Sequence, residues 1–326
     1  MKAVIFGGTG FIGLNLCQRL IHCGWSVTTF SRANLQPGTP DHTHVQGDFT
    51  DAGAVLKAVG SCDVVYHLVH TNTPAGSETD WSRDIAENLV PSIALVEACA
   101  AAGCRLVFAS SGGTIYGKQA LTPIPETATT IPIGAYGTSK LCIEHFLQLG
   151  HLRHGLAVTS LRVSNPFGAL QRGDSGQGAI AAFLRATLKK DPIQIWGDGA
   201  VVRDYVHIDD VIEAFVLAAG ISSGYNVYNV GSGVGRTLND IVAAIEQVTG
   251  QRLARSYTAV RAIDVPVSIL DISKIRRELG WQPALDFERQ ISLTYAAFRS
   301  GFSGPAGGLP ADMRFRAPEI VKRTPK

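Results

Sequence analysis

A glycine-rich turn near the amino end restricts the folds open to this chain. The stretch "VIFGGTGFIGLNL" at 4–16 joins an apolar run of strand character to an amphipathic helical pattern through Gly7, Gly10 and Gly13. Glycines at this spacing permit a tight turn and let the backbone approach a pyrophosphate, whose charge then lies at the amino end of the helix. In this strand–turn–helix context the motif predicts a dinucleotide site rather than a simple glycine turn.

The first half of the chain alternates between strand and helix patterns. Short β-rich apolar runs, typical of buried parallel strands, occur at 2–6, 25–30, 63–69, 105–110 and 157–163, and a further short strand is expected at 44–48. Helical patterns lie at 11–23, 50–59, 79–102 and 136–154. The alternation predicts an α/β fold with a Rossmann, doubly wound parallel sheet over residues 1–165, to which a segment near 200–230 returns.

Beyond residue 165 the pattern is less regular. Helices are predicted near 176–190, 209–220 and 237–249, and a strand is predicted within "GYNVYNVGSG". We assign residues 166–300 mainly to a smaller, interleaved α/β domain that binds the substrate. Residues 301–326 are rich in glycine and proline and are expected to form a tail without a core of its own.

Composition narrows the choice of partners and compartment. The formal net charge of +2 gives no reason to expect nucleic acid or an anionic membrane as a partner. No apolar run approaches the roughly 18 residues of a membrane span, and the amino end lacks a signal-peptide pattern. The six cysteines include no C-x-x-C pair, so reduced thiols in a cytoplasmic protein are expected, and no metal site is expected.

The end of the second predicted strand bears on the choice of cofactor. A carboxylate there would bind the ribose 2′-hydroxyl of NAD, but "SVTTFSR" ends in Ser31 and Arg32. This departure leaves NADP open beside NAD. Asp48 in "QGDFT" is placed to hydrogen-bond the adenine amino group, with Phe49 beside the ring. Helix capping is the alternative role for Asp48.

The hexapeptide "AYGTSK" at 135–140 places Tyr136 and Lys140 on one face of a predicted helix. Oxidation of a hydroxyl group needs a base for the proton and a cofactor ring for the hydride. The pKa of free tyrosine is about 10, so the phenolate must be stabilised before it can act at neutral pH. A lysine one turn away, beside a positively charged oxidised nicotinamide, supplies that stabilisation.

Ten motifs follow one another along the chain: "GGTGFIG", "QGDF", "VVYHLV", "SSGGTIYG", "YGTSK", "NPFG", "GDGAVVRDYVHIDDV", "NVGSG", "RAIDV" and "LDISKIRRELGWQP". From residue 2 to about 295 this series resembles the extended short-chain dehydrogenase/reductases, specifically their NAD-dependent nucleotide-sugar epimerase/dehydratase group, which includes UDP-glucose 4-epimerase-like proteins. There are two departures from the group. Ser31 replaces the acidic residue, and "HLVHTNTP" stands where a histidine-alanine-alanine type sequence is frequent.

The resemblance implies catalytic roles for Tyr136 as acid–base and for Lys140 as a ligand of the nicotinamide ribose. It also implies a hydroxyl donor in "FASSGGTIYG". The usual spacing falls on Gly112, so Ser111 is our choice, with Thr114 as the alternative. Both hydroxyls could instead satisfy only the loop backbone. The expected cofactor contacts are Gly7, Gly10, Phe11, Ile12, Gly13, Ser31, Arg32, Asp48, Phe49, Leu68, Tyr136 and Lys140.

The resemblance also assigns substrate contacts in the second half. Arg203 and Arg261 are expected to bind a diphosphate, for which a guanidinium fork is suited, although surface ion pairs are the alternative. Asn165 is expected at the diphosphate and Asp264 at a ribose hydroxyl. Ser268, small where related enzymes that accept only unacetylated hexoses have a tyrosine, predicts room for a 2-acetamido group. His207, Asp209 and Asp210 are expected to cap the next helix and brace the arginine loop.

The predicted function is therefore a nucleotide-sugar 4-epimerase acting on a UDP-linked sugar and feeding polysaccharide synthesis. Ser111-Gly112-Gly113 lacks the acid that the 4,6-dehydratases carry in this loop, which disfavours dehydration. A net NAD(P)-dependent oxidoreductase or dehydratase is the main alternative, and a non-catalytic dinucleotide sensor is the alternative outside enzymes. The resemblance further implies a homodimer through a four-helix bundle of the helices at 79–102 and 136–154.

Overall fold

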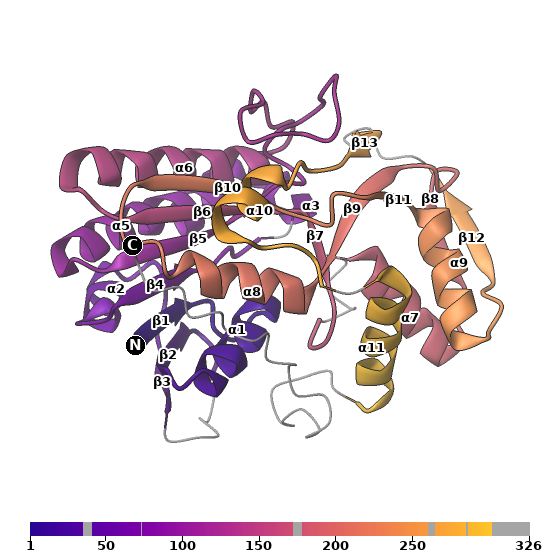
Figure 1. Ribbon diagram of the computed structural model, residues 1–326, viewed down its shortest axis with the longest axis horizontal. Coiled ribbons are helices and arrows are strands. Elements are labelled where there is room, and N and C mark those ends of the chain that lie inside the picture. The colour runs from indigo at the N-terminus through magenta and orange to yellow at the C-terminus, as the bar shows by residue number, and fades with distance from the viewer. Residues whose placement is uncertain (35–40, 73, 172–177, 260–264, 285, 302–326) are drawn as a thin grey trace.

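The computed structural model describes residues 1–34, 41–72, 74–171, 178–259, 265–284 and 286–301, and Figure 1 presents its two units side by side. The larger unit is built on a seven-stranded sheet in the order β3-β2-β1-β4-β5-β6-β10, with every neighbouring pair parallel. Its strands are β1 (Lys2–Phe6), β2 (Ser26–Ser31), β3 (His42–Gln46), β4 (Val64–His67), β5 (Arg105–Ser111), β6 (Val158–Val163) and β10 (Tyr225–Val230). The predicted Rossmann sheet is thus confirmed.

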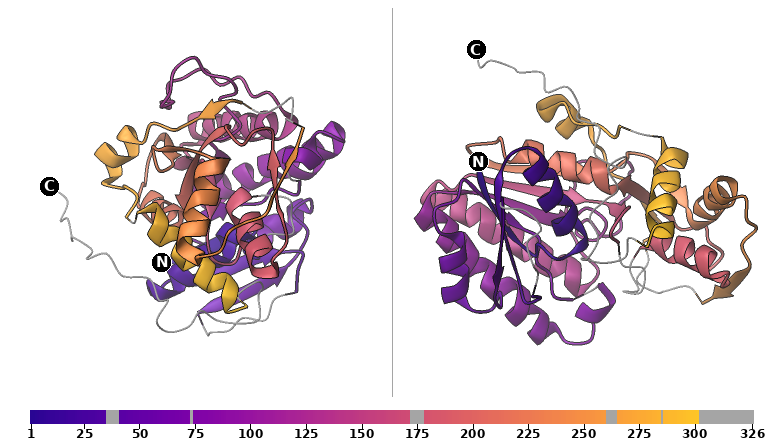
Figure 2. Two further views of the ribbon diagram at one scale, coloured as in Figure 1. Left: turned by 90° about the vertical axis from the view of Figure 1, so that its right-hand side faces the viewer. Right: turned by 90° about the horizontal axis from the view of Figure 1, so that it is seen from below.

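Successive side chains of each strand enter two different cores, because a strand directs alternate residues to opposite faces. In β1, Ile5 packs in one core, while Val4 and Phe6 pack in the other. Helices cover both faces, as the right-hand view of Figure 2 shows. One layer holds α1 (Phe11–His22), α8 (Ile208–Ala218) and α10 (Ser273–Leu279), and the other holds α2 (Ala52–Val59), α5 (Val90–Ala102) and α6 (Ala135–His154).

The helix predicted at 79–102 forms as a continuous run of three pieces: α4 (Trp81–Asp84), the π-helical turn η1 (Ile85–Leu89) and α5. The π turn ends two residues before Pro91, which has no backbone N–H to donate within the first turn of α5. Contrary to the sequence expectation, Trp81–Ala102 is long and apolar enough to pass as a membrane span by length and composition alone. Its Leu95 and Cys99, however, pack in the core formed with α2 and α6, as in a helix of a folded domain.

The smaller unit surrounds strand β9 (Val202–His207). Its strand β11 (Gly235–Thr237) pairs antiparallel with β9, whereas β7 (Asn165–Phe167) and β13 (Val267–Ser268) pair with β9 in parallel. β8 (Ile193–Trp196) and β12 (Arg255–Thr258) form a separate parallel pair. Their core is completed by α7 (Ala179–Lys189), α9 (Leu238–Thr249) and α11 (Phe287–Arg299).

The chain passes between the two units several times. β6 ends in the large sheet at Val163, and β7 starts in the smaller unit at Asn165. After β9, α8 and β10 lie with the large sheet, and α10 packs on β10. This interleaving brings the carboxyl ends of the large sheet next to the strands around β9, which is where open α/β sheets bind ligands. The predicted tail from residue 302 onward lies outside the described residues.

Candidate active site

The glycine turn packs directly against the helix that follows it. Gly7 has a φ of +87°, in the left-handed region, and its carbonyl oxygen accepts a hydrogen bond from the Gly10 N–H at 3.0 Å. A β-carbon at Gly13 would lie 2.3 Å from that same Gly7 oxygen, so a side chain at 13 would fill the turn. Helix α1 begins without a side-chain cap and with no acidic residue in its first turn. Its free N–H groups can therefore receive a pyrophosphate.

At the end of β2, the described residues 31–34 include no carboxylate, as the sequence predicts. The Ser31 hydroxyl donates to the Ala33 carbonyl at 3.4 Å, and Arg32 is exposed. Asp48 is exposed as well, and its Oδ1 accepts from the N–H and hydroxyl of Thr50 at 2.9 and 2.8 Å, which lowers its pKa. The alternative role of Asp48 as a helix cap is wrong, because the side chain that caps α2 is Asp51.

Phe49 is only 5% exposed, and its ring packs on those of Phe6 and His67 with centroids 5.8 and 5.2 Å apart. Its side chain belongs to the core of the sheet, so a contact with adenine would have to come from its backbone. Leu68 follows β4 directly, and its backbone lies 3.1 Å from the position of a β-carbon on Gly7. Leu68 therefore borders the glycine turn on the side of β4.

Tyr136 and Lys140 lie in the first turns of α6, at the carboxyl edge of the large sheet. Lys140 is 3% exposed; its Nζ donates to the Ala109 carbonyl at 2.8 Å and lies 5.8 Å from the centroid of the Tyr136 ring. Burial lowers the pKa of Lys140 to about 7, although Asp84 and Glu144 act to raise it. Burial, assisted by the charge of Asp84, raises the pKa of Tyr136 to about 12. A phenolate at neutral pH thus needs further positive charge beside the ring.

The two predicted candidates for the hydroxyl donor lie at the end of β5 and just after it. Ser111 is the last residue of β5 and is half-buried. Thr114 has a buried hydroxyl with no hydrogen-bond partner among the described residues, and its carbonyl lies 2.7 Å from the position of a β-carbon on Gly137. A side chain at Gly112 would be too close to its neighbours, because a β-carbon there would lie 2.8 Å from the backbone oxygen of Arg162 and 2.5 Å from the Leu270 side chain. Both Ser111 and Thr114 therefore remain candidates for the hydroxyl beside Tyr136.

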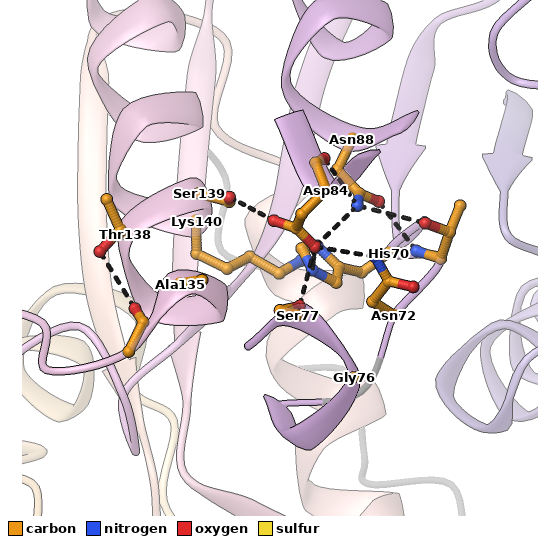
Figure 3. A network of polar contacts seen from close by, with 12 residues as sticks. His70, Asn72, Gly76, Ser77, Asp84, Asn88, Ala135, Thr138, Ser139 and Lys140 are labelled. Carbon is orange, nitrogen blue, oxygen red and sulfur yellow. Dashed lines mark hydrogen bonds and ion pairs between the residues drawn. The ribbon is translucent and has the colours of Figure 1, made fainter. Parts of the chain in front are cut away.

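Two functional candidates that the sequence did not identify complete this region. The His70 ring meets the Tyr136 ring edge-on, with centroids 4.4 Å apart, and its Nε2 lies 3.4 Å from Asp84 Oδ1. Figure 3 shows the Asp84 carboxylate at the centre of a polar network. It accepts from Asn72 at 3.0 Å, Ser77 at 2.8 Å, Asn88 at 3.2 Å and also Ser139. The departure "HLVHTNTP" was the one available signal for His70, and Asp84 had none.

The ionisation of these two groups follows from their surroundings. Burial acts to raise the pKa of Asp84, but the hydrogen bonds from Ser139, Asn72 and Ser77 outweigh it, and the net pKa is lowered. Burial and the charge of Lys140 lower the pKa of His70 to about 3. At neutral pH the pair is therefore a carboxylate beside a neutral imidazole.

A cavity of about 520 Å³ lies in the smaller unit, between β7, α7, β8 and β9. Asn165 and Arg203 line it, together with Phe167, Phe183, Trp196 and Tyr205. The Asn165 amide donates to the Asp204 carbonyl at 2.9 Å, and Arg203 Nη1 donates to the carbonyls of Val202 and Val265 at 2.9 and 2.5 Å. The mixture of aromatic walls and a few polar groups is typical of small-molecule sites.

Strand pairing with β9 brings together the predicted substrate contacts that lie within the described residues. Asn165 on β7 pairs with Tyr205, and buried Ser268 on β13 pairs with Arg203. Gly113, in the loop after Ser111, places its β-carbon position 4.0 Å from the Asn165 amide, so this region adjoins the Tyr136 side of the site. The remaining two predicted contacts, Arg261 and Asp264, lie outside the described residues.

The acidic motif after β9 has a structural role. His207 Nδ1 accepts from the Asp209 N–H at 3.3 Å and caps α8, as predicted. Asp210 accepts from the Ala284 N–H at 2.9 Å and from the Gln290 amide at 3.0 Å. These contacts attach the carboxyl-terminal segment to α8. Within the described ranges, no three His, Cys, Asp or Glu side chains gather as a metal ion would need.

Comparison with known proteins gives a consistent result. The profile of the NAD dependent epimerase/dehydratase family matches residues 3–231. A UDP-glucose 4-epimerase of Mycolicibacterium smegmatis is 31% identical over 92% of this chain and 99% of its own length. A dTDP-4-dehydro-6-deoxyglucose reductase of Escherichia coli is 29% identical over 91% and 97%. The structure of a Thermotoga maritima UDP-glucose 4-epimerase with UDP-glucose has a TM-score of 0.87 at 31% identity, covering 92% and 99% of the two chains.

Proposed function

Because the chain belongs to the NAD dependent epimerase/dehydratase family, we propose that it is a UDP-sugar 4-epimerase that retains NAD between turnovers. The observation that carries the proposal is that Lys140, with Tyr136 one turn before it on α6, bonds β5 of the sheet whose β1 leads into the glycine turn. The loop after β5, Ser111-Gly112-Gly113, has no carboxyl group. This combination provides for oxidation and re-reduction of a hydroxyl, but it includes no acid in that loop for the elimination of water.

NAD fits the residues at the edge of the large sheet. Gly7, Gly10 and Gly13 leave the backbone open to a pyrophosphate, and the uncapped start of α1 supplies the N–H donors. When bound, NAD accepts and returns the hydride of the sugar carbon. Ser31 and Arg32 lie where the adenosine ribose is held in this fold, and Asp48 is exposed at the same edge.

The proton is the part of the reaction that this chain's side chains handle. Tyr136, as a phenolate, removes the proton from the C4 hydroxyl while the C4 hydride leaves, and a 4-keto sugar results. Lys140 stabilises the phenolate, and Ser111 donates a hydrogen bond to the reacting oxygen, with Thr114 as the alternative donor. The keto sugar then rotates within the site, so that the hydride returns to its other face and Tyr136 returns the proton. Protons and hydride balance within each cycle.

The cavity around β9 is proposed to hold the uridine diphosphate part of the substrate. Arg203 and Arg261 would neutralise the diphosphate, Asn165 would hydrogen-bond it, and Asp264 would bind a ribose hydroxyl. Ser268 is small and leaves room for a 2-acetamido group on the sugar. The proposal also places the enzyme in the cytoplasm and its product in polysaccharide synthesis, consistent with the six free cysteines.

A net oxidoreductase is the second candidate, favoured by one relative. The Escherichia coli protein named a reductase matches nearly as much of the chain as the epimerase from Mycolicibacterium smegmatis does. The same Tyr136 and Lys140 would serve both reactions, so these residues do not discriminate. The two candidates differ in whether nicotinamide cofactor is consumed.

The test is a panel of UDP-, GDP- and dTDP-linked sugars, with product stereochemistry read by NMR and reduced nicotinamide read by absorbance. We expect interconversion of C4 epimers of a UDP-sugar, with no net formation of NADH. Turnover that consumes or releases stoichiometric NAD(P)H would contradict the proposal in favour of an oxidoreductase. Loss of the C6 oxygen from the product would contradict it in favour of a dehydratase. Turnover of UDP-glucose without UDP-N-acetylglucosamine would contradict the role of Ser268.

A further inference from the structure

Asp84 is a fully buried carboxylate whose described hydrogen-bond donors are all neutral. Its oxygens accept from Asn72, Ser77, Asn88 and Ser139, which come from the loop after β4, α3 (Pro74–Ser77), η1 and α6. Within the described part of the chain, no arginine or lysine forms an ion pair with it. A buried charge is costly unless another charge compensates it, so a nearby cation is expected.

Lys140 is buried as well, and its ammonium form needs a negative charge nearby. Its Nζ donates to one described carbonyl, that of Ala109. Glu144, one turn further along α6, is already paired with Arg162 through two bonds of 3.1 and 2.6 Å. The charge of Glu144 is therefore largely neutralised, which leaves Asp84 as the available buried carboxylate near Lys140.

Direct contacts connect Asp84 to the reacting residues. Ser139, which donates to Asp84 Oδ2, precedes Lys140 in the chain and so fixes the turn of α6 that carries both reacting side chains. His70 contacts both the Asp84 carboxylate and the Tyr136 ring. The His70 side chain is only 6% exposed, and neither ring nitrogen has a hydrogen-bond partner among the described residues. A buried imidazole without hydrogen-bond partners is unusual and needs an explanation. One explanation is that the neutral ring keeps the Asp84 carboxylate apart from the Tyr136 phenol.

We propose that Asp84 is a positioning residue for the epimerase reaction: its carboxylate balances the Lys140 ammonium, while neutral His70 separates that carboxylate from the Tyr136 phenol. The inference rests on the proposed function, since Lys140 must be a cation to stabilise the phenolate. It also accounts for the histidine in "HLVHTNTP", which the proposed reaction leaves without a role.

The expected pH effect follows from the charges around Lys140 and Tyr136. The titratable groups that face them are His67, His70, Glu78, Asp84 and Glu144. Burial lowers the pKa of Lys140, and Asp84 opposes this change. Removal of the Asp84 charge therefore lowers the pKa of Lys140 further, and Lys140 loses its proton at a lower pH. The fraction of active enzyme then falls earlier as the pH rises.

The experiment compares kcat between about pH 6 and pH 9 for the NAD-loaded wild type, Asp84→Asn and Ser77→Ala. Asp84→Asn removes the charge and preserves size, whereas Ser77→Ala removes one neutral donor and leaves the charge in place. We expect kcat of Asp84→Asn to fall about tenfold relative to the wild type at the alkaline end, since one pKa unit changes protonation tenfold. At the acid end kcat should be retained, because removal of the Asp84 charge also lowers the pKa of Tyr136. Ser77→Ala should keep the wild-type profile.

A second measurement does not depend on turnover. Lysine labelled with ¹³C at Cε is titrated by NMR, and Lys140→Met identifies the Lys140 resonance. We expect the titration midpoint of Lys140 to move to lower pH in Asp84→Asn but not in Ser77→Ala. An unchanged midpoint, or a kcat lowered equally at every pH, would overturn the role of Asp84. If no UDP-sugar is turned over, the proposed function fails, while this titration still decides the charge balance.

Discussion

Tyr136 and Lys140 occupy surroundings that disfavour the ions that the proposed reaction needs. Burial raises the pKa of Tyr136 to about 12 and lowers that of Lys140 to about 7. The positive charge of an oxidised nicotinamide would favour the phenolate, and the Asp84 carboxylate favours the ammonium. The proposed reaction therefore depends on charges from other elements and from the cofactor, as well as on the hexapeptide that contains Tyr136 and Lys140.

Ser111 and Thr114 can be separated by one pair of variants. Ser111→Ala should lower kcat about tenfold to a hundredfold, because a hydrogen bond to a charged oxygen contributes about 1.5–3 kcal/mol. Thr114→Ala serves as the matched control and should retain kcat within about twofold, a change of less than 0.5 kcal/mol. Steady-state kinetics with the epimerised sugar makes the comparison. The reverse order of losses would assign the hydroxyl to Thr114.

At the scale of single elements, the glycine turn combines packing and ligand binding. Gly13→Ala places a methyl group 2.3 Å from the Gly7 carbonyl, which belongs to the backbone and cannot swing aside. We expect a loss of about 1–3 kcal/mol in unfolding free energy, as overpacking costs, together with weakened NAD binding. Gly53→Ala is the control for a change of side chain alone, because Gly53 is an exposed helical glycine without a positive φ and its β-carbon position lies 3.3 Å from only a side-chain oxygen, that of Asp51. Thermal unfolding and titration with NAD measure both effects, and intact NAD affinity in Gly13→Ala would contradict the pyrophosphate role.

Elements with strong periodicity could be predicted from the sequence, and those without it could not. The strand predicted at 2–6 is Lys2–Phe6, and the helix predicted at 136–154 is Ala135–His154. Helix α10 escaped prediction because Ile275 is the one residue it buries, and α11 because polar Gln290 and Thr294 share its buried face with apolar side chains. Helix α10 therefore has too few apolar positions to be identified in the sequence, and the apolar stripe of α11 is interrupted.

The same limit applies to the site. The glycine turn and the Tyr136–Lys140 pair are each contained in one segment, so their spacing carries the signal. His70 and Asp84 become candidates only in the folded chain, because the loop after β4 folds back onto α4 and α6. No local pattern encodes that contact. Phe49 illustrates the opposite error, since an aromatic residue in a motif was expected at the ligand and lies in the core.

At the scale of the whole molecule, two neighbouring helical runs carry exposed apolar side chains. Trp81 is 66% exposed and Leu152 is 72% exposed, and Ile85, Val90 and Leu149 are exposed on the same two helical runs. These runs, 81–102 and α6, pack against each other in the large unit. Exposed apolar residues on neighbouring helices are typical of an interaction surface. We propose that two copies of the chain pair here as a four-helix bundle.

Substitution of Leu152 by Asp should convert the dimer to a monomer, because a charge would be buried in the apolar interface. Light scattering coupled to size exclusion measures the mass of the particle. Leu188→Asp, at an exposed leucine on α7 in the smaller unit, is the matched control and should leave the dimer intact. A wild-type chain that is monomeric at micromolar concentration would contradict the bundle.

The central claim, that Tyr136 transfers the proton in a reversible oxidation at C4, is tested most directly with a UDP-sugar carrying deuterium at C4. NMR follows both epimers for the wild type and Tyr136→Phe, with bound NAD measured in each. We predict that the wild type interconverts the epimers and retains the deuterium at C4, while Tyr136→Phe binds NAD and loses about 10²- to 10⁴-fold in kcat. Turnover by Tyr136→Phe at the wild-type rate, or loss of the deuterium to solvent, would contradict the claim.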